Sequence, residues 1–214
     1  MGKRNMKRAY WFRVMTLLIG GTMLALSGLL LVNAHLGSDS ITVFNQGIAE
    51  LLNIDFSYGV IIGNAVFLIV LLIVDRKSIG VGTLLIMVSI GLMTVLFTKI
   101  GFIPDIADCL WKQIIMVVIG AFFGTFGIAI YVKSDIGLSP FEGVQIFVQK
   151  KLNTRFAYVK IANDAILFTI GYFMGGQFGI FSIITVIIYG PLADMFMMLI
   201  DKSKLFEKKE YEKK

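Results

Sequence analysis

The chain has 214 residues, of which 57% are hydrophobic and only 16% are charged, with a net charge of +6. Soluble domains contain about 45–50% apolar residues, so this composition excludes an ordinary soluble domain, a disordered chain and a disulfide-rich fold. With one cysteine, Cys109, and one histidine, His35, the chain cannot form an intramolecular disulfide or a His/Cys zinc site. We therefore expect no metal and no cofactor.

Six runs of low charge follow one another along the chain, each long enough to cross a membrane. A helix needs roughly 20 apolar residues to span the hydrocarbon layer, where it must pair its own backbone amides. The fifth and sixth runs are separated by the turn Gly175-Gly176-Gln177. The six predicted spans are residues 14–34, 56–74, 79–98, 113–132, 156–174 and 178–200. The sequence thus predicts an all-α membrane protein with six transmembrane helices.

The positive charges lie almost entirely on one side of these spans. Of the 20 lysines and arginines, only Lys99 and Lys112 fall on the other side. Short loops rich in Lys and Arg stay cytoplasmic, so both termini are predicted to be cytoplasmic. A cleaved signal peptide is the alternative for the basic start, but the first run is longer than the usual apolar part of a signal peptide.

The chain also aligns with itself at a shift of 100 residues. Gly37 aligns with Gly137, and Tyr58 with Tyr158. Further pairs are Ile19-Gly20 with Ile119-Gly120, Leu52-Asn53 with Leu152-Asn153, Phe56 with Phe156 and Ala65 with Ala165. Each half holds three spans, an odd number, so the second half is predicted to be inverted relative to the first, as in many secondary transporters.

This repeat divides the chain into five predicted parts. They are a basic cytoplasmic N-terminus (1–13), a first three-helix repeat (14–98), an external loop (99–112), a second three-helix repeat (113–200) and a charged cytoplasmic tail (201–214).

Each half contains one segment too short to span, residues 38–53 and 138–153, and both are predicted to be helical. Asp39 and Ser139 stand at the same repeat position as N-caps. Pro140 follows at the first helical position, and Glu142 completes a capping box with Ser139.

Two placements of these short helices are open. Each helix either lies flat on a membrane face or enters the membrane as a re-entrant half-helix. In the second case their N-termini, preceded by Gly37 and Gly137, meet near the centre of the protein. The positive ends of the two helix dipoles would then suit an anion or a carboxylate.

Two acidic residues lie inside the predicted spans, Asp164 in the fifth and Asp194 in the sixth. An ionisable group in a span costs a few kcal/mol and needs a partner or a function. If the two carboxyls face each other, they predict a site that binds and releases protons. The alternatives are an i,i+4 ion pair between Asp164 and Lys160, and an Asp194 that reaches the membrane surface.

Asparagines place a polar group at mirrored depth in the two halves. Asn64 occupies the repeat position of Asp164, and Asn163 is its neighbour. Hydrogen bonding between helices is the competing interpretation for Asn64. The residues predicted to line a substrate or ion path are Gly37, Asp39, Asn64, Gly137, Ser139, Pro140, Glu142, Asn163, Asp164 and Asp194.

A glycine turn occurs twice, as His35-Leu36-Gly37-Ser38-Asp39-Ser40 and as Asp135-Ile136-Gly137-Leu138-Ser139-Pro140. With these turns, Gly80-Val81-Gly82-Thr83-Leu84, Gly190-Pro191 and the three-plus-three layout, the chain resembles the YczE/YyaS/YitT-like family of bacterial integral membrane proteins. The first copy departs from the pattern, with Ser40 where the second has Pro140. The resemblance implies a protein of the bacterial cytoplasmic membrane, often described as a candidate transporter, and it carries over no catalytic or ligand residue.

These features predict a secondary transporter or permease for a small solute, with anions among the candidates. The alternative is a binding or accessory subunit that does not transport, such as the substrate-capture subunit of an ATP-driven importer. The expected partners are the lipid bilayer and an unidentified small molecule, with a homo-oligomer left open and nucleic acid excluded. An enzyme is not expected, because no nucleophile–base pair, metal triad or phosphate-binding glycine loop occurs where chemistry could use it.

Overall fold

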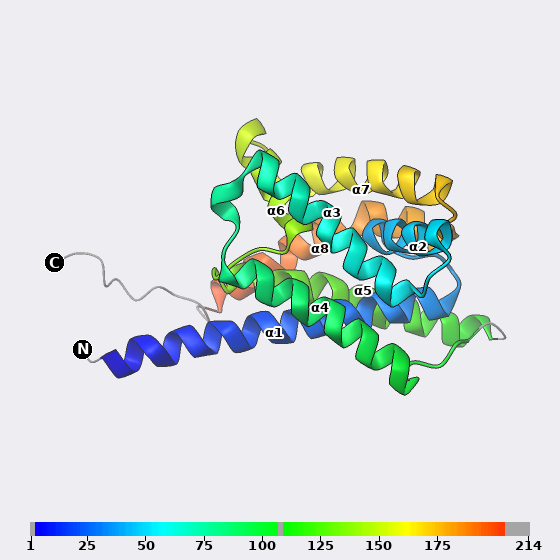
Figure 1. The fold of residues 1–214 in the computed structure, drawn as a ribbon, viewed down its shortest axis with the longest axis horizontal. Coiled ribbons are helices and arrows are strands. Elements are labelled where there is room, and N and C mark those ends of the chain that lie inside the picture. The colour runs from blue at the N-terminus through cyan, green and yellow to red at the C-terminus, as the bar shows by residue number, and fades with distance from the viewer. Residues whose placement is uncertain (1–2, 107–108, 204–214) are drawn as a thin grey trace.

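The computed structural model describes residues 3–106 and 109–203. In this part of the chain there are eight α-helices and one short 3-10 helix (Figure 1). They are α1 (Lys3–Ala34), α2 (Ser40–Leu52), α3 (Phe56–Val74), η1 (Arg76–Ser78), α4 (Val81–Ile100), α5 (Leu110–Lys133), α6 (Pro140–Leu152), α7 (Phe156–Phe173) and α8 (Ile180–Lys202). The predicted all-α fold is confirmed. Residues 204–214 of the predicted tail lie outside the described residues.

Five of these helices are long and apolar enough to cross a membrane: α1 from Tyr10 to Ala34, α3, α4, α5 and α8. They match five of the six predicted spans and make the chain a multi-pass membrane protein by length and hydropathy. The remaining predicted span, residues 156–174, coincides with α7 (Phe156–Phe173), which is not one of the five. The polar residues Lys160, Asn163 and Asp164, whose surroundings are described below, lower the mean hydropathy of α7.

The boundaries of the helices differ from the prediction mainly at the N-terminus. Helix α1 begins at Lys3, so the predicted basic segment before residue 14 continues the first span as helix. Lysine, arginine and methionine favour helix, and neither proline nor glycine interrupts this stretch after its first turn. The predicted external loop is shorter than expected, because α4 extends to Ile100 and α5 already begins at Leu110.

The two short helices start and stop as their sequences predict. Asp39 and Ser139 are the N-cap residues of α2 and α6, both with extended backbones. Asn53 and Asn153 end the same helices with φ of 52° and 48°. Asparagine tolerates this left-handed conformation better than most residues, which explains why both helices stop there.

Helices α1 and α5 cross closely and run antiparallel. The Ser27 hydroxyl of α1 donates a hydrogen bond to the carbonyl oxygen of Gly120 at 2.7 Å. A Cβ atom at Gly20 would lie 3.0 Å from the carbonyl oxygen of Gly127. Small residues at these positions let the two backbones approach each other, as in many membrane helix pairs.

Two of the other helices pack directly on this pair. Helix α4 packs on α1, and α8 packs on α5. Helix α2 lies against α3 and α7, and α6 lies against the same two helices, toward the opposite end of the bundle (Figure 1). The short helices therefore occupy matching positions between long helices.

The N-terminal parts of both short helices are buried. In α2 the buried stretch runs from Thr42 to Ala49, and in α6 the residues Phe141, Glu142 and Gln145 are buried. A helix lying flat on the surface of the protein would expose one whole face. Each short helix therefore starts inside the bundle.

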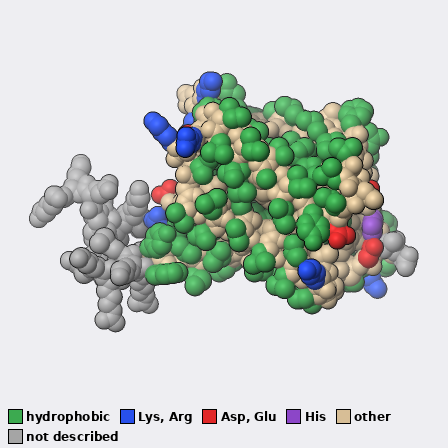
Figure 2. Space-filling model, in the orientation of Figure 1, with side chains coloured by type: hydrophobic (Ala, Val, Ile, Leu, Met, Phe, Trp, Pro, Cys, Tyr) green, Lys and Arg blue, Asp and Glu red, His purple; other side chains and the backbone are tan. Residues whose placement is uncertain are grey.

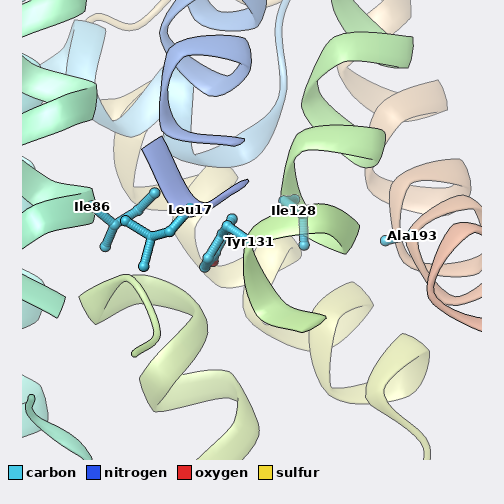
Figure 3. Close-up of a cluster of buried hydrophobic side chains, with 5 residues drawn as sticks. All are labelled: Leu17, Ile86, Ile128, Tyr131 and Ala193. Atoms are coloured by element: carbon cyan, nitrogen blue, oxygen red, sulfur yellow. The ribbon is translucent and has the colours of Figure 1, made fainter. Parts of the chain in front are cut away.

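The core and the surface have the character of a membrane protein. Leu17, Ile86, Ile128, Tyr131 and Ala193 form a buried cluster at the contact of α1, α4, α5 and α8 (Figure 3). In Figure 2 hydrophobic side chains cover the broad face of the molecule, while charged side chains gather toward its two ends. Such a wide apolar surface suits contact with lipid.

Candidate functional site

A cavity of about 80 Å³ lies where the N-terminal ends of α2 and α6 approach each other. All eight helices contribute to its lining, and Asp39 and Ser139, the two N-caps, face it together with Glu142 and Lys160. One water molecule needs roughly 10–15 Å³ of such space, so the cavity holds several waters or a solute of a few heavy atoms. The N-caps of the two short helices thus line the same cavity.

A buried ion pair stands at the α7 side of the cavity. The Lys160 ammonium lies 3.0 Å from a carboxylate oxygen of Asp164, one helical turn away, and both side chains are only 3% exposed. Asp164 also accepts a hydrogen bond from the Ser40 hydroxyl at 2.7 Å, which ties α7 to the first residue of α2. The i,i+4 interpretation of Asp164 is confirmed. Because this ion pair is deeply buried, loss of either partner should destabilise the protein.

Two aromatic rings fix Lys160 further. Its ammonium lies 5.5 Å from the centre of the Phe141 ring and 5.9 Å from that of Tyr189. A cation at such a distance over a ring face is attracted by the ring. Lys160 is therefore held in place by a carboxylate on one side and by rings from α6 and α8 on the others.

The carboxylates of Asp39 and Glu142 have hydroxyl partners instead of basic ones. Asp39 accepts a hydrogen bond from the Thr42 hydroxyl at 2.7 Å. Glu142 accepts one from the Ser139 hydroxyl, whose oxygen in turn accepts the backbone N–H of Glu142 at 3.5 Å. Among the described residues, neither carboxylate forms an ion pair with a lysine or an arginine.

Two buried polar atoms of the lining lack a hydrogen-bond partner among the described residues. They are the side-chain oxygen of Asn45 and the hydroxyl of Tyr189. These residues are 6% and 3% exposed. Buried polar atoms in native proteins are nearly always satisfied by protein, water or ligand, so both atoms are available to whatever fills the cavity.

Of the other predicted path residues, only Asn64 reaches the cavity, and its amide nitrogen donates to the carbonyl oxygen of Val60 at 2.9 Å. Pro140 is buried at the start of α6. Asn163 lines a separate groove of about 430 Å³ beside Gln145. Asp194 lies beside Arg155 and the backbone of Ala157. The structure does not bring the carboxyls of Asp164 and Asp194 together: Asp164 contacts Lys160 and Ser40, whereas Asp194 interacts with Arg155 and the backbone of Ala157.

The two predicted turn glycines sit next to the cavity and pack on other helices. A Cβ atom at Gly37 would lie 2.5 Å from the hydroxyl oxygen of Ser182, near the start of α8. One at Gly137 would lie 2.5 Å from the backbone nitrogen of Thr83, near the start of α4. Both turns therefore press against the beginning of another helix, and only a residue without a side chain fits.

Sequence reasoning missed Tyr189 and Thr42, and it treated Lys160 only as a partner of Asp164. Tyr189 lies within an apolar run and Thr42 on a short amphipathic segment, where neither residue type is unusual. Only the packing of α2, α6 and α8 brings them to one place. The sequence offered one signal for Lys160: it is a lysine within a predicted span, and such residues usually face the interior of a bundle.

The comparisons with known proteins give the chain a family. Residues 11–198 match the sequence pattern of a family of unknown function, DUF6198. The chain belongs to this family. It is also 26% identical over 193 residues to an uncharacterized protein of Haemophilus influenzae, an alignment that covers 90% of this chain and 86% of that protein. No solved structure matches the chain. The DUF6198 match includes every residue of the cavity lining, so the function is argued from that cavity.

The hydrogen bond from Ser40 to Asp164 makes a first testable prediction. Replacing Ser40 by alanine should lower the free energy of unfolding by about 1.5–3 kcal/mol, because a buried carboxylate loses a donor. The matched control is Ser57→Ala, which removes a hydroxyl that donates to Thr98, an uncharged partner, at 3.1 Å. That control should cost about 0.5–1.5 kcal/mol. Equilibrium unfolding in mixed detergent micelles measures both, and equal losses would contradict a special role for the bond to Asp164.

Proposed function

We propose that this protein is a secondary transporter or permease that moves a small solute through the cavity between α2 and α6. The observation that carries the proposal is the cavity itself. It brings together the ends of two short helices and the buried ionisable residues Asp39, Glu142 and Lys160 inside a bundle of membrane helices. Ionisable groups at such a place are costly, and in membrane proteins they mark substrate and ion pathways.

The arrangement of the helices supports two inverted repeats, in which α7 adds one more membrane span to the five long apolar helices. The contacts come in matched sets: α1–α4 matches α5–α8, and α2–α7 matches α6–α3, while α1 packs on its own counterpart α5. Backbone conformations match as well, because His35 and Asp135, 100 residues apart, have φ of 55° and 57°. Inverted repeats with a site at their interface are the plan of many secondary transporters.

The short helices then act as re-entrant elements that separate the cavity from the two sides of the membrane. Gly37 in the first half touches Gly179 at the start of α8, and Gly137 in the second half touches Gly82 in α4. Each of these contacts joins one half to the last helix of the other. Opening one contact while the other stays closed would expose the cavity to one side at a time.

The charges at the ends of the bundle support the orientation with both termini in the cytoplasm. Arg13 pairs with Asp135 at 3.7 Å, and Lys133 pairs with Asp201 at 2.5 Å. These two ion pairs place the N-terminal part of α1 next to the C-terminal end of α5, and the C-terminal end of α5 next to that of α8. This is the end that the positive-inside rule assigns to the cytoplasm. The resemblance to the YczE/YyaS/YitT-like proteins agrees with the bacterial cytoplasmic membrane.

Thiol labelling tests the proposal. Single cysteines are placed at Thr42 and Ser139 in a Cys109→Ser background, and vesicles of both orientations are treated with a membrane-impermeant thiol reagent. We expect each cavity cysteine to react from both sides and the two rates to change in opposite directions with ionic conditions. A cysteine at Leu84, an exposed residue of α4, is the control for labelling without access to the cavity.

Labelling from one side under all conditions would contradict alternating access. It would favour the accessory-subunit alternative, in which the same cavity only captures a solute. Solute uptake by proteoliposomes that contain this chain alone separates the two functions, because an accessory subunit produces no uptake without its ATPase partners.

A further inference from the structure

The cavity holds more acid than base. Three carboxylates, those of Asp39, Glu142 and Asp164, lie within electrostatic reach of a single ammonium, that of Lys160. The N-termini of α2 and α6 each add a positive end equivalent to about half a charge. About one negative charge is thus left without a partner in a place where a bare charge is costly.

The unpartnered polar atoms of the lining independently indicate the sign of the missing group. The side-chain oxygen of Asn45 is an acceptor, and the hydroxyl oxygen of Tyr189 accepts as well as donates. Both residues line the cavity together with Asp39 and Glu142, whose carboxylates add further oxygen atoms to the lining residues. Carboxylate, amide and hydroxyl oxygens are the ligands of hard cations and of ammonium groups.

We propose that the cavity binds one small monovalent cation, an alkali metal ion or a primary ammonium ion, next to Asp39 and Glu142. This inference rests on the proposed function and names the class of its solute. It replaces the anion that two helix N-termini alone would favour, because those N-termini already face the carboxylates of Asp39 and Glu142. The volume of about 80 Å³ restricts the occupant to a few heavy atoms.

Lys160 does not take the place of this cation. Its ammonium is 3.0 Å from Asp164 and is held between the rings of Phe141 and Tyr189. The Lys160–Asp164 pair is neutral as a whole, so it leaves the charges of Asp39 and Glu142 in place. A divalent cation would overcompensate the single missing charge and calls for six or more oxygen ligands.

Protons should compete with the cation. The titratable groups that face Asp39 and Glu142 are Lys160 and Asp164 from α7, Tyr131 from α5 and Tyr189 from α8. The lining residues of α1, α3 and α4 carry no ionisable side chain. Protonation of Asp39 removes one of the charges that attract the cation, so the apparent affinity should fall as the pH falls.

The test is the thermal unfolding of the purified full-length protein in detergent. N-methylglucamine chloride, whose cation is too large for the cavity, is replaced at constant ionic strength by lithium, sodium, potassium or methylammonium chloride. At about pH 8 at least one of these salts should raise the unfolding temperature in a saturable way. The midpoint concentration should rise as the pH is lowered to about 5. The metal salts and methylammonium form separate arms, which tell the two kinds of cation apart.

Two variants and a matched control locate the effect. Glu142→Gln and Asp39→Asn should each raise the midpoint concentration about tenfold or more, the loss expected when a charged partner becomes neutral. Glu50→Gln removes the same charge from an exposed position of α2 and should leave the midpoint unchanged. If one of the two cavity variants does not fold, the midpoint concentration of the other variant tests the proposal. No saturable effect of any cation, or an effect that survives in the cavity variants, would overturn the proposal.

Failure of the cation site and failure of transport give different results. Saturable binding without uptake of the same cation by proteoliposomes leaves the site standing and contradicts transport. Uptake of an anion or a neutral solute that no cation affects leaves transport standing and overturns the cation site.

Discussion

Replacing Lys160 by methionine should destabilise the protein by about 3–5 kcal/mol, because the carboxylate of Asp164 is left buried without its partner. The two side chains are 3% exposed, so water cannot replace the lost ammonium. Methionine has a similar length and keeps the contacts with Phe141 and Tyr189, which separates the effect of the charge from that of packing. Equilibrium unfolding in mixed micelles gives the free energy.

A second substitution tests the cause. The double variant Lys160→Met/Asp164→Leu removes both charges and should recover most of the lost stability, since an apolar pair of similar volume is often as stable as a buried ion pair. The matched control is Lys133→Met. Lys133 pairs with Asp201 at 2.5 Å, but its side chain is 28% exposed and that of Asp201 60%, so this loss should be about 0–1 kcal/mol. A Lys160→Met variant no less stable than the control would show that Asp164 finds another partner.

The long helices of this fold are predictable from the sequence, and one of them shows the limit of that prediction. An apolar run without charges has few structures open to it in a membrane, which is why α3, α4, α5 and α8 fall where their hydropathy places them. Helix α7 is less apolar because Lys160 and Asp164 point into the bundle, where each is the other's partner. Hydropathy averages over all faces of a helix and cannot register this.

The placement of the short helices is only half predictable. The caps at Asp39 and Ser139 and the ends at Asn53 and Asn153 follow from local backbone chemistry. Whether such a helix lies on the membrane or enters it depends on what receives its buried face, and an amphipathic pattern suits both. The contacts of α2 and α6 with α3 and α7, which bury these helices against the bundle, are tertiary and cannot be read from the amphipathic pattern.

The candidate site likewise contains residues that the sequence predicts and residues whose position depends on tertiary packing. Asp39, Ser139 and Glu142 are predictable, because they stand at helix starts that local capping signals reveal. Asp194 resembles Asp164 in sequence, yet it lies beside Arg155, because the side on which a helix residue falls depends on how the helix is rotated against its neighbours. Depth in the membrane alone does not predict that two carboxylates meet.

Alanine at Gly37 should be the most damaging small substitution in the turns that precede the short helices. Gly37 has φ of +99°, a backbone conformation that residues with a side chain rarely adopt. Its new Cβ atom would also lie 2.5 Å from the hydroxyl oxygen of Ser182 and 2.8 Å from the backbone of Gly179. The backbone strain costs about 1–3 kcal/mol, and the crowding costs about as much again.

Two further glycines separate the backbone effect from the crowding. Gly101 ends α4 with φ of +64°, and a Cβ atom there would meet nothing within 4 Å, so Gly101→Ala should show the strain alone, about 1–2 kcal/mol. Gly137 has no positive φ, but its Cβ atom would lie 2.5 Å from the backbone nitrogen of Thr83. Gly137→Ala should therefore show the crowding alone, about 1–3 kcal/mol. Unfolding free energies of the three variants, measured side by side, check the order.

The same variants bear on the movement of the two halves. If the turn at Gly37 opens against α8 during transport, the crowded contact in Gly37→Ala should favour the separated arrangement and raise thiol labelling at Thr42 from that side. Gly137→Ala should do the same at Ser139 from the opposite side, because its contact is with α4. Gly101→Ala changes neither contact and should leave both labelling rates as they are. Equal labelling changes in all three variants would mean that lost stability, and not the release of a particular contact, opens the cavity.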